Sequence, residues 1–563
     1  MLAGLDFWHP VDSTRITEPN LEALLRVRDF HSPPAAGERF HRAKETIPYV
    51  LFPEWLVCPN CERLAPYQTF LGIFPGTRAP RCDRCNRQLY PARLIVACQA
   101  GHIDDFPWEW WVHEAQGKAC TGKPALGLKT LGRTATLGDL LIYCRTCKES
   151  RTLAGATYPE KLAGLACSGR RPWVRDEEEC TEKPVVLQRG ASNVYFPIVV
   201  SGLSIPPWSG SVQLAIGRHW DLLRNLAENS PQSLEPTIEA LDLPRKSGFS
   251  VRDILDAVQK RLDNEAPGTV QVSEADLRFQ EHLALRSPHM AREGDELEVR
   301  ETSVDQTLAH HISRVRLVTR LREVRALIGF TRVVSPDPMS RLETKVAPLS
   351  RQRKSWLPAI EVNGEGIYIE LNEDALLSWS REKRVQARAA LLKDTYVEMC
   401  GRRHWQPKRP ITPRLLLVHS LAHLLIRQLS LECGYSSASL RERLYVCEPD
   451  AESGRPGVAG VLIYTAAVDS DGSLGGLVRQ GLPERLTRTV RDGIQSASWC
   501  ASDPLCLETE GQGPDALNLA ACHACLLVSE TSCEEFNRFL DRATLIGPPG
   551  APEAGFFSRL LSG

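Results

Sequence analysis

The stretch CPNCERLAPYQTFLGIFPGTRAPRCDRC, residues 58–85, indicates how the first part of the chain folds. Cys58-x2-Cys61 and Cys82-x2-Cys85 are separated by twenty residues, a spacing typical of a zinc ribbon with two knuckles. Each C-x2-C turn lets two thiolates face one ion, and the intervening hairpin brings the second pair around to complete a tetrahedron. We therefore predict a structural zinc site formed by Cys58, Cys61, Cys82 and Cys85.

The other cysteines are concentrated in two blocks. Ten of the eighteen cysteines lie between Cys58 and Cys180, and five lie between Cys500 and Cys533. The N-terminal residues lack the basic and apolar regions of a signal peptide, and the apolar stretch Leu415–Ile426 is too short to span a bilayer. We expect a cytoplasmic protein without a membrane span. Disulfides are rare in that compartment, so the cysteines are interpreted as metal ligands or buried thiols.

A third C-x2-C pair, Cys144 and Cys147, predicts a second zinc site, for which Cys167 and Cys180 are the nearest remaining thiols. A third site in this block is an open alternative. Its candidate ligands are Cys98, His102, His113 and Cys120, although Cys120 could instead join the second site.

The C-terminal block contains Cys522-x2-Cys525-x7-Cys533, three ligands of one predicted site that needs a fourth from upstream. Cys506 is the preferred fourth ligand and Cys500 is the reserve. An iron–sulfur cluster also accepts four cysteines, but we expect zinc.

Length and composition favour a folded chain of several domains, with 563 residues, 42% hydrophobic and 24% charged. We expect an α+β multidomain protein. Its predicted parts are an N-terminal arm (1–45), a zinc-ribbon-containing domain of short strands (46–200), a helical middle domain (201–340), a hairpin with a connecting helix (341–410), and a mixed α/β C-terminal domain with a zinc site (411–563).

Local patterns predict individual elements. Ser273 and Asp276 indicate a capping box, and the helical pattern of the middle domain includes the long apolar segment 308–328. Asn363-Gly364, flanked by alternating residues 357–371, predicts a hairpin. Further helices are expected at 382–399, 414–431 and 484–492, and a buried strand at 458–467.

Catalytic motifs are weak. Residues 117–124 (GKACTGKP) approach a phosphate loop, but Pro124 replaces the Ser or Thr that holds magnesium, so we expect no ATPase in this chain. His419 and His423 lie one helical turn apart, but Ser420 stands where a zinc protease needs Glu, which favours core histidines. A metal-dependent nuclease using His102, Asp104, Asp105 and His113 is the second hypothesis.

Nucleic-acid contacts are predicted only locally, because 68 basic and 69 acidic residues nearly cancel. The segment RRHWQPKR, residues 402–409, sets an aromatic ring among cations, as in grooves that bind single strands. Its predicted DNA contacts are Arg402, Arg403, Trp405, Lys408 and Arg409, and the alternative is a solvated linker. The arginine-rich segment 312–354 could contact phosphates or form salt bridges with its neighbours.

Several long segments carry a family resemblance. HSLAHLLIRQLSLECGYSSASLRERLY (419–445), GVLIYTAAVDSDGSLGGLVRQG (460–481) and the segment from WCASDPLC (499–506) to NLAACHACLLVSETSCEEFNRFLDR (518–542) resemble a helicase-associated domain of unknown function with a zinc-binding tail. CQAGHIDDFPWEWWVH (98–113), RGASNVYFP (189–197), RLREVRALIGF (320–330) and WLPAIEVNGEGIYIEL (356–371) are similar to the DrmB family of the bacterial DISARM antiphage system.

That resemblance implies a partner rather than a reaction. DrmB-like proteins work with DrmA, a separate superfamily 2 DNA helicase, and engage foreign DNA alongside methyltransferase and phospholipase-D-like components. We therefore expect a non-catalytic zinc-binding subunit of a defence complex. The resemblance supplies no catalytic residue, but it implies that Cys522, Cys525 and Cys533 are zinc ligands.

Overall fold

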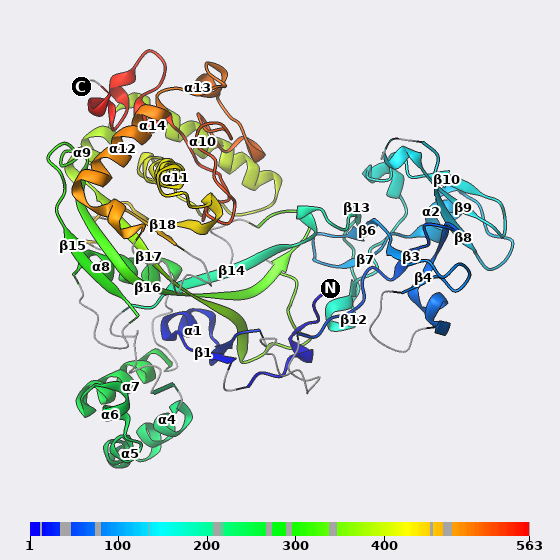
Figure 1. Ribbon diagram of the computed structural model, residues 1–563, viewed down its shortest axis with the longest axis horizontal. Coiled ribbons are helices and arrows are strands. Elements are labelled where there is room, and N and C mark those ends of the chain that lie inside the picture. The colour runs from blue at the N-terminus through cyan, green and yellow to red at the C-terminus, as the bar shows by residue number, and fades with distance from the viewer. Residues whose placement is uncertain are drawn as a thin grey trace. The chain divides into compact units, whose positions relative to one another are not determined.

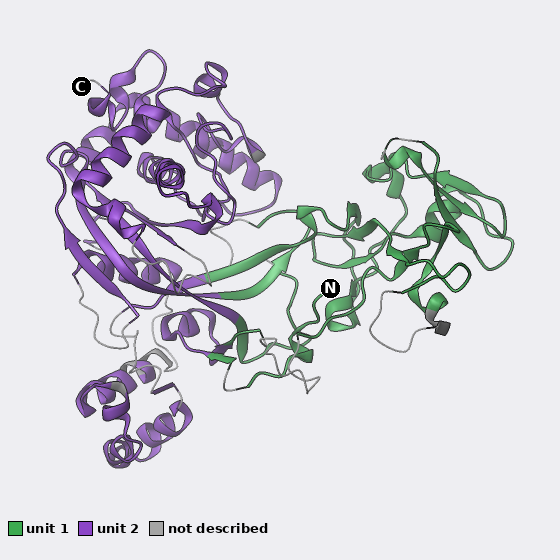
Figure 2. Ribbon diagram, viewed as in Figure 1, with its two compact units in different colours: residues 1–15, 31–200, 326–358 green, residues 16–30, 201–325, 359–563 purple. Residues whose placement is uncertain are grey.

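The computed structural model describes residues 1–11, 14–33, 47–73, 80–132, 134, 136–205, 216–217, 219–265, 273–288, 296–336, 346–450, 454–465 and 476–561. The chain forms two compact units, coloured separately in Figure 2. Unit 1 comprises Met1–Arg15, His31–Val200 and Ala326–Pro358, and unit 2 comprises Ile16–Phe30, Ser201–Arg325 and Ala359–Gly563. Helices and sheets both occur in the chain, which confirms the expected multidomain α+β class (Figure 1).

Unit 1 consists mainly of short strands joined by turns. Its elements are β3 (Trp55–Val57), β4 (Arg63–Pro66), β5 (Tyr90–Pro91), β6 (Leu94–Ala97), β7 (Ile103–Asp105), α2 (Trp108–Val112), β8 (Leu126–Thr130), β9 (Leu140–Cys144), β10 (Ser150–Thr152), β11 (Arg170–Arg171), β12 (Asp176–Glu177) and β13 (Val185–Gln188). One sheet has the order β10-β9-β8-β4-β3-β5, and another has the order β13-β6-β7. The core beside them is small and includes Phe106, Trp108 and Trp111.

Unit 2 holds the long helices and strands. Its elements are α1 (Pro19–Leu25), α4 (Trp220–Asn229), α5 (Leu234–Ala240), α6 (Leu243–Ser247), α7 (Val251–Glu265), α8 (Glu274–Arg286), β15 (Glu298–Thr302), most of β16 (Ile312–Thr331) and β17 (Trp356–Leu371), α9 (Glu373–Ser380), α10 (Lys383–Arg402), α11 (Pro413–Cys433), β18 (Leu440–Cys447), β19 (Val458–Thr465), α12 (Pro483–Ala497), α13 (Leu505–Glu508) and α14 (Ala543–Ile546). The strands β1 (Arg15–Ile16), β2 (Asp29–His31) and β14 (Phe196–Leu203) have residues in both units.

The central sheet of unit 2 is buried on both faces. β19 pairs antiparallel with β17 and with β18, and β15 pairs antiparallel with β16. Because side chains alternate along a strand, Ile367 and Ile463 pack with α11 and α12, whereas Tyr368 and Tyr464 pack in a second cluster with α8. The sheet therefore separates two apolar layers, and its strands read as continuous apolar runs.

The segment 308–328 was expected to be helical, and that prediction is wrong. Residues from Ile312 onward form β16, in which Arg314, Arg316, Arg320 and Arg322 recur with the period of a strand. The β-branched residues Ile312, Val315 and Val318 favour a strand. An apolar run buried on both faces has no clear periodicity, so the sequence alone did not distinguish it from a helix.

The hairpin predicted at Asn363-Gly364 is also absent from the described residues, because β17 runs through this position as one strand. A type I′ turn requires positive φ at both central residues, and neither has it. A Cβ at Gly364 would lie 2.2 Å from the carbonyl oxygen of Thr465. The glycine therefore allows close approach of a neighbouring backbone rather than a turn.

Other local predictions are confirmed. α10, α11 and α12 cover the three expected helices, and β19 covers the described part of the strand expected at 458–467. The capping box is present, with the Ser273 hydroxyl and the Asp276 backbone N–H joined at the start of α8. Residues 466–475 of the quoted segment 460–481 lie outside the described residues.

Candidate metal centres

Three C-x2-C turns of unit 1 share one backbone geometry. The N–H of the first cysteine donates to the carbonyl oxygen five residues later, and the residue four positions later donates back to the cysteine carbonyl. That later residue is left-handed in each turn, with φ of 61° at Glu62, 51° at Asn86 and 69° at Lys148. The three turns begin at Cys58, Cys82 and Cys144. A shared turn of this kind brings both thiols of each pair to one side.

The first predicted quartet is brought together by β3, β4 and the turn before β5. The Sγ atoms of Cys58 and Cys85 are 3.2 Å apart, and those of Cys61 and Cys82 are 3.6 Å apart. All four sulfurs lie within 4.8 Å of one another. Four thiolates at this separation can surround one tetrahedral zinc ion.

The remaining ligands of unit 1 are grouped differently from the prediction. Cys144 and Cys147 lie with His113 and Cys120, whereas Cys167 and Cys180 lie with Cys98 and His102. The quartet of Cys144, Cys147, Cys167 and Cys180 is therefore not assembled, and the four candidates for a third site are divided between two clusters. The tight β6–β7 turn, with Gly101 at φ 92°, sets Cys98 and His102 side by side.

Each histidine of these two clusters has an outer hydrogen-bond partner. His113 Nδ1 donates to the carbonyl oxygen of Glu109 at 2.8 Å, which leaves Nε2 facing Cys147 Sγ at 3.3 Å. His102 uses the opposite nitrogens. Its Nε2 contacts the Glu178 carboxylate at 2.8 Å, and its Nδ1 lies 3.4 Å from Cys98 Sγ. A carbonyl or carboxylate on the second ring nitrogen fixes the tautomer and orientation of a metal-binding histidine.

The C-terminal quartet contains both candidate upstream ligands and excludes Cys533. Cys500 Sγ lies 3.5 Å from Cys522 Sγ, and Cys506 Sγ lies 3.7 Å from Cys525 Sγ. Arg427 of α11 holds the knuckle from outside by donating to the carbonyl oxygens of Ala524 and Leu527 at 2.8 and 3.0 Å. Cys506, the preferred fourth ligand, and Cys500, the alternative, therefore both belong to this cluster.

Some cysteines of these clusters have a lowered pKa, whereas burial raises the pKa of others, among them Cys98, Cys167 and Cys506. Burial raises the pKa of Cys144, but backbone N–H groups, led by that of Cys147, outweigh it and lower the pKa to about 6. A hydrogen bond from Cys58 lowers the pKa of Cys85 to about 6. Zinc prefers donor sets of four sulfurs, or of three sulfurs and one imidazole nitrogen.

Comparison with known proteins agrees with this ligand chemistry. Residues 421–526 match the MrfA Zn-binding domain, and this range contains all four cysteines of the C-terminal quartet. Residues 1–196 match a domain of unknown function, DUF8724. The DISARM protein DrmB of Bacillus paralicheniformis is 32% identical over 577 residues, covering 100% of this chain and 99% of the relative.

The chain belongs to the DrmB family. A crystal structure of the DUF1998 helicase MrfA bound to DNA aligns with 37% of this chain and 21% of the helicase chain, at 11% identity and a TM-score of 0.16. In this DrmB-family chain, zinc is the cofactor that the Cys and Cys/His quartets suit. A search of its described residues finds no helix long and apolar enough to cross a membrane.

Cys533 lies in a second cluster of the C-terminal region, with His419, His423 and Glu442. From the sequence, His419 and His423 were predicted to be core residues, and no role was predicted for Glu442. Both rings are fully buried, as a core position requires, but they lie beside the Glu442 carboxylate and the Cys533 sulfur. Burial raises the pKa of Cys533 well above its usual value, and the Glu442 carboxylate adds to the effect.

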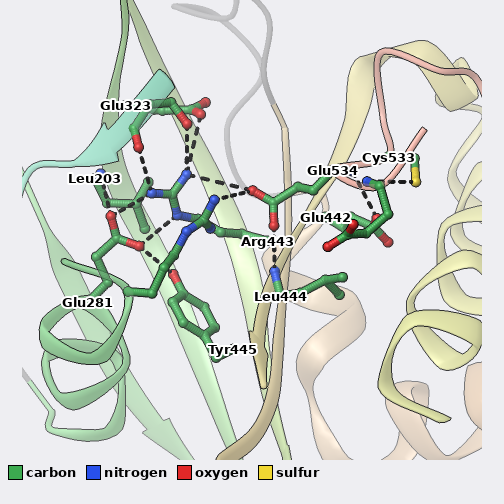
Figure 3. Close-up of polar contacts among 12 residues, drawn as sticks. Leu203, Glu281, Glu323, Glu442, Arg443, Leu444, Tyr445, Cys533 and Glu534 are labelled. Atoms are coloured by element: carbon green, nitrogen blue, oxygen red, sulfur yellow. Dashed lines mark hydrogen bonds and ion pairs between the residues drawn. The ribbon is translucent and has the colours of Figure 1, made fainter. Parts of the chain in front are cut away.

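The strand β18 presents charge to both sides of the sheet (Figure 3). Glu442 points toward Cys533, and the next residue, Arg443, points the other way. The Arg443 guanidinium is fully buried and pairs with both Glu281 oxygens at 2.5 and 2.7 Å. Glu534 joins the two sides, since it accepts from the Leu444 N–H at 2.9 Å and pairs with Arg278 at 2.6 Å.

The structure separates the five predicted DNA contacts of this DrmB-family chain into two groups. Arg403 pairs with Asp515 at 2.6 Å and stacks on Trp405, and Arg409 pairs with Glu535 at 2.7 Å. Trp405 is half-buried against the α10–α11 core. Arg402 and Lys408 are exposed, and the Arg402 side chain, which is 64% exposed, lies 4.0 Å from the Glu398 carboxylate. The second group is the more exposed of the two.

The arginine-rich segment favours its salt-bridge interpretation. Arg314 pairs with Glu370 at 2.7 Å, Arg325 pairs with Glu323 at 2.6 Å, and Arg322 contacts Glu18 and Glu361. Residues 337–345 of this segment lie outside the described residues. These three paired guanidinium groups stabilise the sheet of unit 2, whereas Arg320, Arg351 and Arg353 of the same segment are exposed.

Proposed function

We propose that this chain is a non-catalytic, zinc-binding subunit of an antiphage defence complex that associates with a DrmA-like superfamily 2 DNA helicase and helps bind foreign DNA. The observation that carries the proposal is the match over the whole chain to the DISARM protein DrmB. The proposed location is the cytoplasm, where phage DNA is met, with methyltransferase and phospholipase-D-like components as further partners.

The metal chemistry supports a structural role. Each quartet offers four protein ligands to one ion, whereas a catalytic zinc keeps a coordination position open for water. Pro124 in the phosphate-loop-like segment agrees with an ATPase that resides in the partner.

A reconstitution experiment tests the proposal. The purified chain alone should hydrolyse neither ATP nor DNA, and adding it to its helicase should change the ATPase rate or the affinity for DNA. Unchanged ATPase rate and DNA affinity in the mixture would refute the proposed association.

The exposed cations define the DNA part of the test. In the complex, the double variant Arg402→Ala, Lys408→Ala should weaken DNA binding and reduce the slope of log affinity against log salt by about 2, because each lost phosphate contact removes about 1. Arg224→Ala, which removes an arginine from an exposed pair on α4, is the matched control and should leave the slope unchanged. An unchanged slope in the double variant would exclude this segment from DNA binding.

A metal-dependent nuclease is the second candidate, because a cavity of about 210 Å³ is lined by His102, Asp104 and Asp105. Burial raises the pKa of Asp105 to about 6. However, both Asp105 oxygens accept backbone N–H groups, and Asp104 pairs with Arg170 at 2.6 Å. His113 belongs to another cluster. Magnesium- or manganese-dependent DNA cleavage that disappears in Asp104→Asn would favour this candidate, and absence of cleavage with any divalent metal would remove it.

A further inference from the structure

Four buried side chains from three segments converge beneath the sheet of unit 2. His419 and His423 lie on α11, Glu442 lies on β18, and Cys533 lies in the loop that follows the C-terminal knuckle. The first three are 0% exposed and Cys533 is 5% exposed. One nitrogen, oxygen or sulfur atom of each lies within 4.8 Å of those of the others.

The contacts inside this cluster do not form a complete hydrogen-bond network. His423 Nε2 and Glu442 Oε2 are 3.6 Å apart, and within the described part of the chain neither has a hydrogen-bond partner. His419 Nε2 lies 3.2 Å from Cys533 Sγ and also 3.2 Å from Glu442 Oε1, and a single ring proton cannot serve both. Buried polar atoms are normally paired, so these orphan atoms need another partner.

Helix geometry and backbone contacts direct these groups toward one another. His419 and His423 are four residues apart and therefore lie on one face of α11. His423 Nδ1 donates to the Leu526 carbonyl oxygen at 3.0 Å, which leaves Nε2 as an acceptor facing the cluster. Cys533 Sγ accepts the backbone N–H groups of Glu535 and Asn537 at 3.3 and 3.2 Å.

We propose that His419, His423, Glu442 and Cys533 bind one further divalent cation of the zinc class. Two imidazoles, one carboxylate and one thiolate are ligands of a borderline-soft ion, and the two anionic groups balance its charge in a site without solvent. The ion partners the orphan atoms and ties α11, β18 and the C-terminal loop together. With four buried protein ligands, it is a closed structural site.

This site is separate from the one that the matched Zn-binding domain accounts for. Residues 421–526 include every ligand of the C-terminal cysteine quartet, but they exclude both His419 and Cys533. The two sites share a segment, since Leu526 follows Cys525 directly and its carbonyl oxygen holds His423.

Native mass spectrometry of the full chain tests the proposal by counting bound zinc. The wild-type protein should carry five ions, and Cys533→Ala should carry one fewer. The control is Cys447→Ala, a lone and partly buried cysteine of β18, which should carry the wild-type number. A wild-type chain with four ions, or an unchanged number in Cys533→Ala, would overturn the proposal.

A second measurement does not depend on folding of the variant. Anomalous diffraction at the zinc edge from wild-type crystals should give a peak about 2.0–2.3 Å from His419 Nε2, His423 Nε2, a Glu442 oxygen and Cys533 Sγ. Peaks at the other four quartets with none between these four side chains would contradict the fifth site even if Cys533→Ala were insoluble.

Discussion

Unit 1 places three cysteine-rich quartets among strands of two to five residues, and its apolar clusters are small. Unit 2 has most of a 16-residue strand and a 21-residue helix, and its main apolar cluster extends over α9, α11, α12, α14 and the central sheet. Metal binding supplies folding free energy that a small core cannot. We infer that unit 1 needs bound zinc to fold. In unit 2 the helices and the sheet pack around an apolar core without zinc, and zinc only fixes the loops that they carry.

Loss of one knuckle ligand should have the largest effect. In Cys58→Ser the first quartet retains three thiolates, and metal binding worth about 10 kcal/mol in isolated zinc modules is weakened or lost. We expect the described parts of residues 55–91 to become sensitive to protease and the chain to lose solubility. Cys433→Ser, at a partly buried lone cysteine of unit 2, is the control and should behave like the wild type. A soluble Cys58→Ser chain with undiminished protease resistance would contradict the role of zinc in unit 1.

The stability of unit 2 should depend strongly on the buried ion pair between Arg443 and Glu281. Glu281→Gln leaves the Arg443 charge without its closest carboxylate in a fully buried position and should cost about 3–5 kcal/mol of unfolding free energy, measured by urea denaturation. Arg224→Gln breaks an exposed pair with Glu228 on α4 and should cost about 0.5 kcal/mol or less. Equal costs for the two variants would show that buried charge does not stabilise the framework.

Weakening the hydrogen bond to the outer nitrogen of a histidine ligand should have a smaller effect, on zinc affinity. Glu178→Gln weakens the hydrogen bond to His102 Nε2, and zinc affinity at the Cys98 quartet should fall by about 10- to 100-fold in chelator competition. The exposed neighbour offers a matched control, Glu179→Gln, which should leave the affinity unchanged. No change in Glu178→Gln would mean that this carboxylate does not orient the ligand.

The smallest expected effect on stability comes from removing the N-terminal cap of α8, a helix without a metal ligand. Ser273→Ala removes the capping hydroxyl of α8 and should cost about 1 kcal/mol. The same hydroxyl is the main cause that lowers the pKa of Asp276, so that pKa should rise toward its ordinary value in the variant, as measured by NMR titration. Ser287→Ala at the other end of α8 is the control. An unshifted Asp276 pKa in Ser273→Ala would refute this role of the cap.

The sequence predicted local structure well because local structure rests on neighbouring residues. The C-x2-C turns, the capping box and α11 each depend on residues within a few positions of one another. Sequence also predicted zinc, since thiolate pairs at that spacing have few other uses in a reducing compartment. The Asn363-Gly364 signal failed because close packing against Thr465, a hundred residues away, decides the backbone there.

The grouping of ligands was not predictable from spacing. Cys144 and Cys167 are closer in sequence than Cys98 and Cys167, but the β6–β7 turn and the loop after Leu165 bring the latter pair together. Cys533 follows Cys525 by eight positions, yet its loop turns the thiol toward α11. Glu442 had no local signal at all, because its partners lie on the preceding helix and on a loop that comes much later in the chain.

Hydrogen exchange of the full chain with and without a zinc chelator tests the contrast between the units most directly. Zinc removal should increase exchange in the described parts of residues 55–105 and 126–152 to the level of an unfolded chain. Over the same time the centre of α11 and strand β19 should retain most of their protection. Similar loss of protection in all four segments, or none in unit 1 after verified zinc removal, would contradict that contrast.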